Sequence, residues 1–252
     1  MNIYKTHEVA QIIGIHVNTV RLYEKCKLIS KLDRLSNGYR VFTDLHIEQF
    51  RMARAVLKVE VLQNGLRKQA VDILKVSALG CFDNAKKMAE CYIQQLDSEM
   101  NRAEEAIEIA HKILAGCHCD ADISDRTFYL TRKGTAELLN ITIDTLRNWE
   151  LNGLITIKRK QNRYRVYLYE DIQRLKIIRS LRCANYSLSA ILRMLQELSH
   201  NPSADLRETI NTPKADEDVI AACDKLLTSL NEAKINMLYA MAQIEKIQQM
   251  KK

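Results

Sequence analysis

Residues 18–24 read NTVRLYE, and residues 144–150 read DTLRNWE. The match continues on both sides, because HEVAQIIGI and KGTAELLNI precede the two stretches while NGYRVF and NRYRVY follow them. Two segments that share so many motifs in the same order indicate a duplicated domain. We therefore expect two or more domains in this chain of 252 residues.

The composition favours helices. The sequence holds 7 Gly and 2 Pro, so few residues break a helix, and we expect a mostly α protein. No run approaches the roughly 18 apolar residues of a membrane span, and the start lacks the cationic-then-apolar order of a signal peptide. The odd number of cysteines, 7, argues against a secreted disulfide scaffold. These features predict a cytoplasmic protein with reduced thiols.

The charge follows the repeat. The net charge is +6 over residues 1–80, −6 over 81–125, +8 over 126–200 and −1 over 201–252, within a total of +7. The positive charge therefore belongs to the duplicated segment, which suggests a polyanionic partner and above all nucleic acid. A membrane surface also fits the charge, but neither copy shows a basic amphipathic helix with aromatic anchors.

Each copy begins with the pattern of two short helices. In the first copy, apolar residues recur at helical spacing over residues 9–13, and Thr6 is the expected N-cap. Gly14 ends this helix, and a second one starts near His16. Two short helices joined by a tight turn indicate a helix-turn-helix. The equivalent residues of the second copy are Thr131 and Thr142 as caps and Asn140 at the turn.

A hairpin is expected after each second helix, in SNGYRVF (36–42) and QNRYRVY (161–167). Asn-Gly is the strongest short hairpin signal, because both residues can take positive φ. Arg163 replaces Gly38 in the second copy, so its turn should be strained or of another type.

Two further helices are expected after each hairpin, and the second helix of each copy carries T-[VL]-R-x-[YW]-E. This order of motifs resembles the DNA-binding domain of the MerR family of transcription regulators. The resemblance implies a mostly α chain with two winged helix-turn-helix domains, each followed by a long antiparallel coiled-coil helix. The expected parts are a first domain (1–80), a first long helix (81–115), a linker (116–128), a second domain (129–200) and a connector with the second long helix (201–252).

The second helix of each copy must keep an apolar face inward and turn polar side chains toward the major groove. By resemblance, Asn18 lies among the residues that read base edges, while the arginines, aromatic residues and hairpin mainly hold phosphates. Asp144 departs from this pattern, since it accepts from a cytosine amine or repels the backbone. The two copies should therefore read different half-sites. The expected DNA-binding residues are Asn18, Thr19, Arg21, Tyr23, Tyr39, Arg40, Asp144, Thr145, Arg147, Trp149, Arg163, Tyr164 and Arg165.

A purely structural interpretation competes with this one. In it, the arginine of each second helix pairs with the glutamate three residues later, and Tyr39 and Tyr164 are core residues. Its weakness is that the same constellation occurs twice.

Two long helices are expected over residues 83–114 and 216–250, because apolar residues recur there at spacings of three and four. Neither helix can bury such a stripe alone. The first stripe is Ala85, Ala89, Tyr92, Leu96, Met100, Ala103, Ile107, Ala110 and Leu114, and the second is Val219, Cys223, Leu226, Leu230, Ala233, Met237, Ala240, Ile244 and Ile247.

The resemblance implies that each long helix pairs antiparallel with a twin. Because this chain holds both helices, we expect an intrachain pseudo-dimer, favoured by covalent linkage and by acidic residues on the first helix facing lysines on the second. A homodimer with four helix-turn-helix segments is the alternative.

Residues 116–120 read GCHCD, and metal-sensing members of the family place thiol ligands near this point. Cys117, His118 and Cys119 are therefore candidate ligands for a thiophilic metal. The second copy has no equivalent cluster, so a segment with incidental cysteines is the alternative, and no cofactor is expected to be required.

These observations predict a sequence-specific transcription regulator that binds two unequal half-sites of a promoter in double-stranded DNA and distorts the DNA between them. The resemblance adds RNA polymerase as a partner. A DNA-architectural or bridging protein is the alternative function, and a thiol-based metal or redox sensor the alternative trigger. An enzyme is not expected, because no nucleophile-base constellation or Gly-rich phosphate loop is evident.

Overall fold

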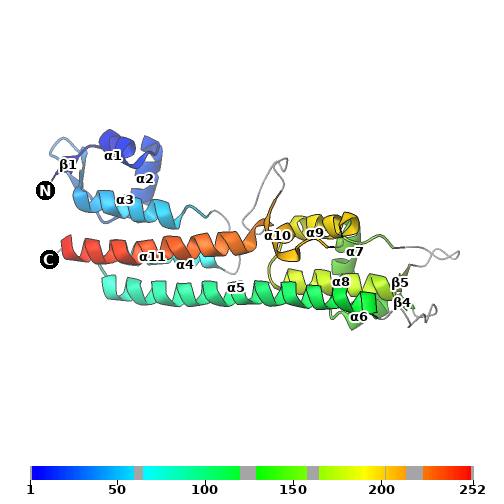
Figure 1. Cartoon of the computed structure of the whole chain (residues 1–252). Helices are drawn as coiled ribbons and strands as arrows, with labels where there is room; N and C mark the ends of the chain where they lie inside the picture. The colour runs from blue at the N-terminus through cyan, green and yellow to red at the C-terminus, as the bar shows by residue number, and fades with distance from the viewer. Residues whose placement is uncertain are drawn as a thin grey trace. The chain divides into compact units, whose positions relative to one another are not determined.

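The computed structural model describes residues 2–59, 65–119, 129–157, 165–201, 203–213 and 224–250, with side chains to Leu114 in the second of these ranges. Across these residues it has eleven helices and five short strands, which confirms a mostly α fold (Figure 1). The chain divides into two compact parts. The first comprises Met1–Ser98 with Ser229–Lys252, and the second comprises Glu99–Thr228.

The first copy begins with the helix-turn-helix of α1 (Thr6–Ile13) and α2 (Val17–Lys25). Lys5 is the N-cap of α1, and its backbone N–H donates to the Glu8 carboxylate at 2.6 Å. The prediction of Thr6 as the cap is wrong, because Glu8 satisfies this end of the helix from within. Gly14 has φ of 69° and ends α1 in the left-handed region, as predicted.

Three short strands pair beside these helices, namely β1 (Ile3–Tyr4), β2 (Asp33–Arg34) and β3 (Arg40–Thr43), with β3 in the middle and antiparallel to both. The predicted hairpin is thus the β2–β3 pair. Its turn differs from the one expected: Gly38 has φ of 80°, whereas Asn37 is not among the residues with positive φ. The Gly38 N–H donates to the Leu35 carbonyl and the Leu35 N–H to the Tyr39 carbonyl, at 2.8 and 2.9 Å. These bonds fit a three-residue loop closed by a glycine bulge.

Two longer helices complete the first copy, α3 (Asp44–Val56) and α4 (Leu66–Ala78). Phe42 and Phe50 are fully buried and form the centre of the core. The Arg67 guanidinium donates to the Leu57 and Val59 carbonyls at 3.0 and 2.8 Å. These bonds satisfy carbonyls at the end of α3 that the helix itself leaves unpaired.

The long helices are α5 (Phe82–Cys119) and α11 (Leu226–Met250). In the first compact part, the beginning of α5 lies alongside α11 with the opposite direction (Figure 1). Lys86 donates to Gln248 at 3.0 Å, whereas Asp97, three turns later, pairs with Lys234 at 2.7 Å. The two helices are therefore antiparallel, and both belong to one chain.

The burial of the two apolar stripes differs from prediction only in the first stripe. Every described member of the second stripe, from Leu226 to Ile247, is buried, while its first two members lie outside the described residues. In the first stripe, Glu99 and Ala106 are buried in place of Met100 and Ile107, so the prediction is wrong there, and Leu114 at its end is only half-buried. Glu99 tolerates this position because it accepts from Asn185 at 3.2 Å and pairs with Arg102 at 3.1 Å.

The second copy repeats the first copy's elements. Thr131 and Thr142 cap their helices as predicted, accepting from the backbone N–H groups of Gly134 and Thr145. Asn140 has φ of 49° and takes the place of Gly14. Of the second predicted hairpin, residues 158–164 lie outside the described residues. The elements are β4 (Tyr129–Thr131), α6 (Arg132–Leu138), α7 (Ile143–Leu151), β5 (Val166–Leu168), α8 (Tyr169–Cys183) and α9 (Leu188–His200).

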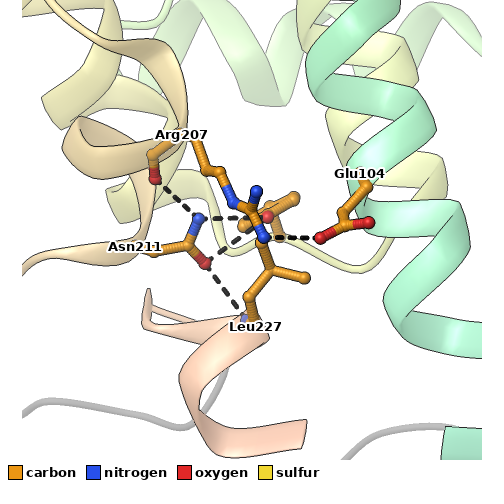
Figure 2. A network of polar contacts seen from close by, with 5 residues as sticks. Glu104, Arg207, Asn211 and Leu227 are labelled. Atoms are coloured by element: carbon orange, nitrogen blue, oxygen red, sulfur yellow. Dashed lines mark hydrogen bonds and ion pairs between the residues drawn. The ribbon is translucent and has the colours of Figure 1, made fainter. Parts of the chain in front are cut away.

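The second compact part also contains α10 (Leu206–Asn211), for which the described residues of the first copy show no counterpart. Figure 2 shows its polar contacts: Arg207 reaches Glu104 of α5 at 2.5 Å, and the Asn211 side chain accepts from the Leu227 N–H at 3.1 Å. The Asn211 amide also donates to the Arg207 carbonyl at 2.8 Å. Helix α10 thereby links the middle of α5 to the first turn of α11.

Candidate nucleic-acid interface

The outward faces of α2 and α7 carry most of the residues predicted to contact DNA. Asn18 and Arg21 are exposed on α2, and Asp144 and Arg147 are exposed at the same positions of α7. Val20 and Leu146, which point the other way, are fully buried. Each helix is therefore held by its apolar side and leaves polar side chains free, as a helix that enters the major groove requires. Thr19 and Thr145 lie half-buried at the edges of these faces.

The aromatic residue of the repeated motif does not lie on the outward face. Tyr23 and Trp149 were expected there, but they are 7% and 4% exposed. Tyr23 stacks on Phe50 of α3, with ring centroids 5.6 Å apart and nearly parallel planes. Burial raises the pKa of Tyr23, and the neighbouring Arg54 opposes this shift. The expected outward placement is wrong, because the aromatic residue lies two positions after the arginine. At that spacing its side chain points to the opposite side of the helix, which for Tyr23 is the side that faces α3.

The glutamate of the motif joins α2 to the hairpin. Glu24 accepts from the Arg40 Nε at 2.5 Å and from Arg34 at 3.4 Å. The alternative pairing of Glu24 with Arg21 does not occur: Arg21 forms no salt bridge with any described residue. Because Arg40 uses its Nε for Glu24, its two terminal nitrogens remain available to an anion.

The same glutamate has more partners in the second copy. Glu150 accepts from Arg132 at 2.8 Å, from Arg165 at 3.1 Å and from the Tyr167 hydroxyl, and its side chain is 9% exposed. Burial and the Glu150 hydrogen bond raise the pKa of Tyr167 to about 12. The Tyr167 hydrogen bond and Glu150 also raise the pKa of Arg132. Arg147 forms no salt bridge with any residue that the structure describes.

The hairpin residues can be placed only in the first copy. Tyr39 is 70% exposed at the tip of the β2–β3 hairpin, so it is not the core residue of the competing interpretation. Arg163 and Tyr164 lie outside the described residues, while Arg165 immediately precedes β5.

Two residues that the sequence did not single out belong to these surfaces. Lys25 is exposed in the last turn of α2, one turn beyond Arg21. Its spacing of four residues from Arg21 could have predicted that both lie on the same face of the helix. Arg132 is the first residue of α6, and its partner Glu150 is 18 residues away in the chain. No local pattern predicts that contact.

The predicted metal ligands Cys117, His118 and Cys119 lie in the last turn of α5, where side chains are outside the described part of the structure. The helix thus continues into the segment expected to be a linker. Cys81 and Cys91 are free and exposed. Among the described residues no group of three or more His, Cys, Asp or Glu side chains could hold a metal ion. The metal site stays a prediction.

No helix in the described ranges combines the length and apolarity that crossing a membrane would need.

Two helix-turn-helix segments with exposed polar faces on their second helices define a class of DNA-binding proteins. Comparison with family models agrees: residues 5–42 match the MerR family regulatory protein, and residues 131–198 match the MerR HTH family regulatory protein. These matches support membership of the MerR family and imply DNA-binding transcription regulation. No curated protein and no solved structure matches the chain.

Proposed function

We propose that the chain is a transcription regulator whose two helix-turn-helix segments bind unequal half-sites of one promoter and distort the DNA between them. The observation that carries this proposal is the difference between two otherwise equivalent outward faces. On α2, Arg21 and Lys25 are exposed without an exposed acidic neighbour on that helix. On α7, the exposed Asp144 offsets Arg147, and Leu151 stands where the first copy has Lys25. The first face suits phosphates and guanine edges, and the second is close to neutral.

The proposed DNA contacts follow from this placement. Asn18, Thr19 and Arg21 act from α2, and Asp144, Thr145 and Arg147 act from α7. Tyr39, with Arg40 through its terminal nitrogens, holds a phosphate beside the first half-site, and residues 163–165 do so in the second copy. Tyr23 and Trp149 support their helices from behind and contact no base.

The resting molecule in this proposal is a monomeric pseudo-dimer, supported by the antiparallel contacts of Lys86 and Asp97 with α11 of the same chain. RNA polymerase is the proposed partner at the promoter, on the family resemblance. Light scattering tests the first point, since a mass near 29.1 kDa is expected. Twice that mass at every concentration would instead show a homodimer.

The test of DNA recognition is selection of duplexes from a random library by the full chain, followed by affinity measurements with Arg21→Ala and Arg147→Ala. Each variant should lose about tenfold or more in affinity, nearly uniformly across the selected duplexes, and reduce the salt slope by about one, because a phosphate contact is lost. If Arg147→Ala leaves affinity and preference unchanged for every selected duplex, the second copy does not read DNA.

Footprinting on a selected promoter separates the proposed regulator from a bridging protein. A regulator protects one compact site with altered reactivity between the half-sites, because the DNA there is distorted. Dispersed protection without such a distorted centre would favour bridging.

A further inference from the structure

A groove in the first compact part lies where α1, α3 and α11 meet. It is an open groove of about 460 Å³, and its walls include Ile12 and Ile13 of α1, Arg51 and Arg54 of α3, and Ile235 and Tyr239 of α11. Three of the apolar side chains stay accessible: Ile12 is 45% exposed, Ile235 56% and Tyr239 41%. One side of the groove is thus apolar and the other carries guanidinium groups.

The charged side of the groove is not neutralised. Glu48 is nearly buried and accepts from both Arg51, at 2.7 Å, and Lys246 of α11, at 3.0 Å. One carboxylate therefore serves two cations. Arg54 forms no salt bridge with any described residue and lies within the groove wall. The net excess of positive charge calls for an anion.

The size and chemistry of the groove select among occupants. Its volume falls in the range of about 300–1,000 Å³ that is typical of small-molecule sites. A DNA backbone would satisfy the arginines but leave the exposed isoleucines uncovered. A second copy of the chain, docked through the same patch about a twofold axis, would bring the unpaired positive charges together.

From this groove we infer that the chain binds a small amphipathic organic anion, with its apolar body against Ile12, Ile235 and Tyr239 and its anionic group on Arg54. Carboxylate and sulfonate groups both suit a guanidinium, because either can accept two parallel N–H bonds.

The walls of the groove come from both the helix-turn-helix and the pairing helix. A bound anion therefore stabilises one arrangement of these elements relative to another. Such a ligand would change the affinity of the first copy for its half-site. The size of the change is set by how much more tightly the ligand binds one of these arrangements than the other. This regulatory step rests on the proposed DNA-binding function, whereas binding of the anion does not.

The probe for the site is 1-anilinonaphthalene-8-sulfonate, whose fluorescence rises in an apolar environment, titrated into the native full chain without DNA. Saturable binding of one probe per chain is expected, with Arg54→Gln weakening it about tenfold or more. Ile235→Ser should weaken it as well. N-phenyl-1-naphthylamine, which keeps the rings and lacks the sulfonate, should bind weakly and be insensitive to Arg54→Gln.

Two matched controls locate the effect. Arg179 occupies the position of Arg54 in the second copy and lines a separate hollow beside Trp149, so Arg179→Gln should leave the affinity for the probe unchanged. Leu238 is 50% exposed on α11 but does not line the groove, so Leu238→Ala should also be silent. Equal probe affinity in the wild type, Arg54→Gln and Ile235→Ser would overturn the site, provided that circular dichroism shows all three folded.

A DNA arm separates the site from the regulation. Probe-saturated protein should show a shifted affinity for a duplex carrying the first half-site, and the shift should vanish in Arg54→Gln. Unchanged DNA affinity in the presence of bound probe would overturn the regulatory step alone. A loss of DNA affinity in Arg54→Gln without probe would assign Arg54 to a phosphate and overturn the proposal.

Discussion

The two copies of the helix-turn-helix have the same backbone conformation at equivalent turns, while their exposed residues differ. Residues 126 positions apart take the left-handed conformation in both, Gly14 with Asn140 and Lys27 with Gly153. In both, a glutamate at the end of the motif forms a salt bridge with an arginine that begins or directly precedes a strand, Arg40 in the first copy and Arg165 in the second. At equivalent exposed positions of the second helices, Asn18 is replaced by Asp144 and Lys25 by Leu151, so the charge of the two faces differs. The two copies thus share the residues that maintain the fold and differ in the exposed residues that would face a ligand. Differences between the copies therefore indicate different binding specificities.

The largest expected effect tests whether the motif aromatic belongs to the core in both copies. Tyr23→Ala and Trp149→Ala should each destabilise the chain by about 3–5 kcal/mol, the cost of removing a buried aromatic ring. Arg21→Ala and Arg147→Ala, on the exposed faces, should stay within about 0.5 kcal/mol. Urea unfolding followed by circular dichroism measures all four. An unchanged midpoint for Tyr23→Ala with lost DNA affinity would restore Tyr23 as a DNA contact.

The second comparison concerns the two glutamates. Glu150→Ala leaves two arginines and a buried hydroxyl without their acceptor and should cost about 2–3 kcal/mol, whereas Glu24→Ala, whose side chain is 23% exposed, should cost about 1 kcal/mol. Trp149 is the one tryptophan in the sequence, so its fluorescence reports on the second copy. The Trp149 unfolding midpoint should fall in Glu150→Ala and stay constant in Glu24→Ala. Equal costs would show that the additional partners of Glu150 add nothing.

Alkaline pH should distinguish the copies through Tyr167, whose place Phe42 takes in the first copy. Folding raises the pKa of Tyr167 from 10.0 to about 12. Below pH 10 the phenol is protonated in both states, and its contribution to stability is complete. As the pH rises from 10 toward 12 the unfolded chain ionises first, so the free energy of unfolding falls.

Tyr167→Phe should therefore flatten the loss of stability over that window, measured by urea unfolding with Trp149 fluorescence. The loss should not disappear, because burial also raises the pKa values of Tyr92 and Tyr186 to about 12. Parallel pH curves for the wild type and the variant would contradict a raised pKa at Tyr167.

The repeat made the order of elements and the inward stripes predictable, since both depend on spacing along one helix. The stripe residues of α11, which begin at Leu226 and end at Ile247, are buried as their spacing of three and four indicated. The failures have both local and long-range causes. Glu99 and Ala106 lie in the first stripe because they continue its strict alternation of four and three residues, which Met100 and Ile107 break. The hydrogen bond from Asn185, 86 residues away, satisfies the buried Glu99 carboxylate, and no local pattern predicts that contact. Arg40 was expected on a phosphate, and nothing in its local sequence showed that Glu24 would hold its Nε. The type of the turn at Gly38 depends on whether Asn37, Gly38 or both take positive φ. The Asn-Gly sequence alone does not decide this.

The smallest expected effect concerns the left-handed residue after each second helix. Lys27 has φ of 58°, a conformation that costs a residue with a Cβ about 1 kcal/mol, whereas Gly153 takes φ of 75° without that cost. A Cβ at Gly153 would meet no atom within 4 Å, so Gly153→Ala should lower stability by the backbone term alone, about 1 kcal/mol. Lys27→Gly should raise stability by about 0.5 kcal/mol, because relief of the strain exceeds the entropy that glycine loses on folding. Trp149 fluorescence follows the first variant in urea, and circular dichroism follows the second. A destabilised Lys27→Gly would mean that the lysine side chain contributes more to the first copy than its exposed position indicates, and the two turns would then differ in more than their backbone.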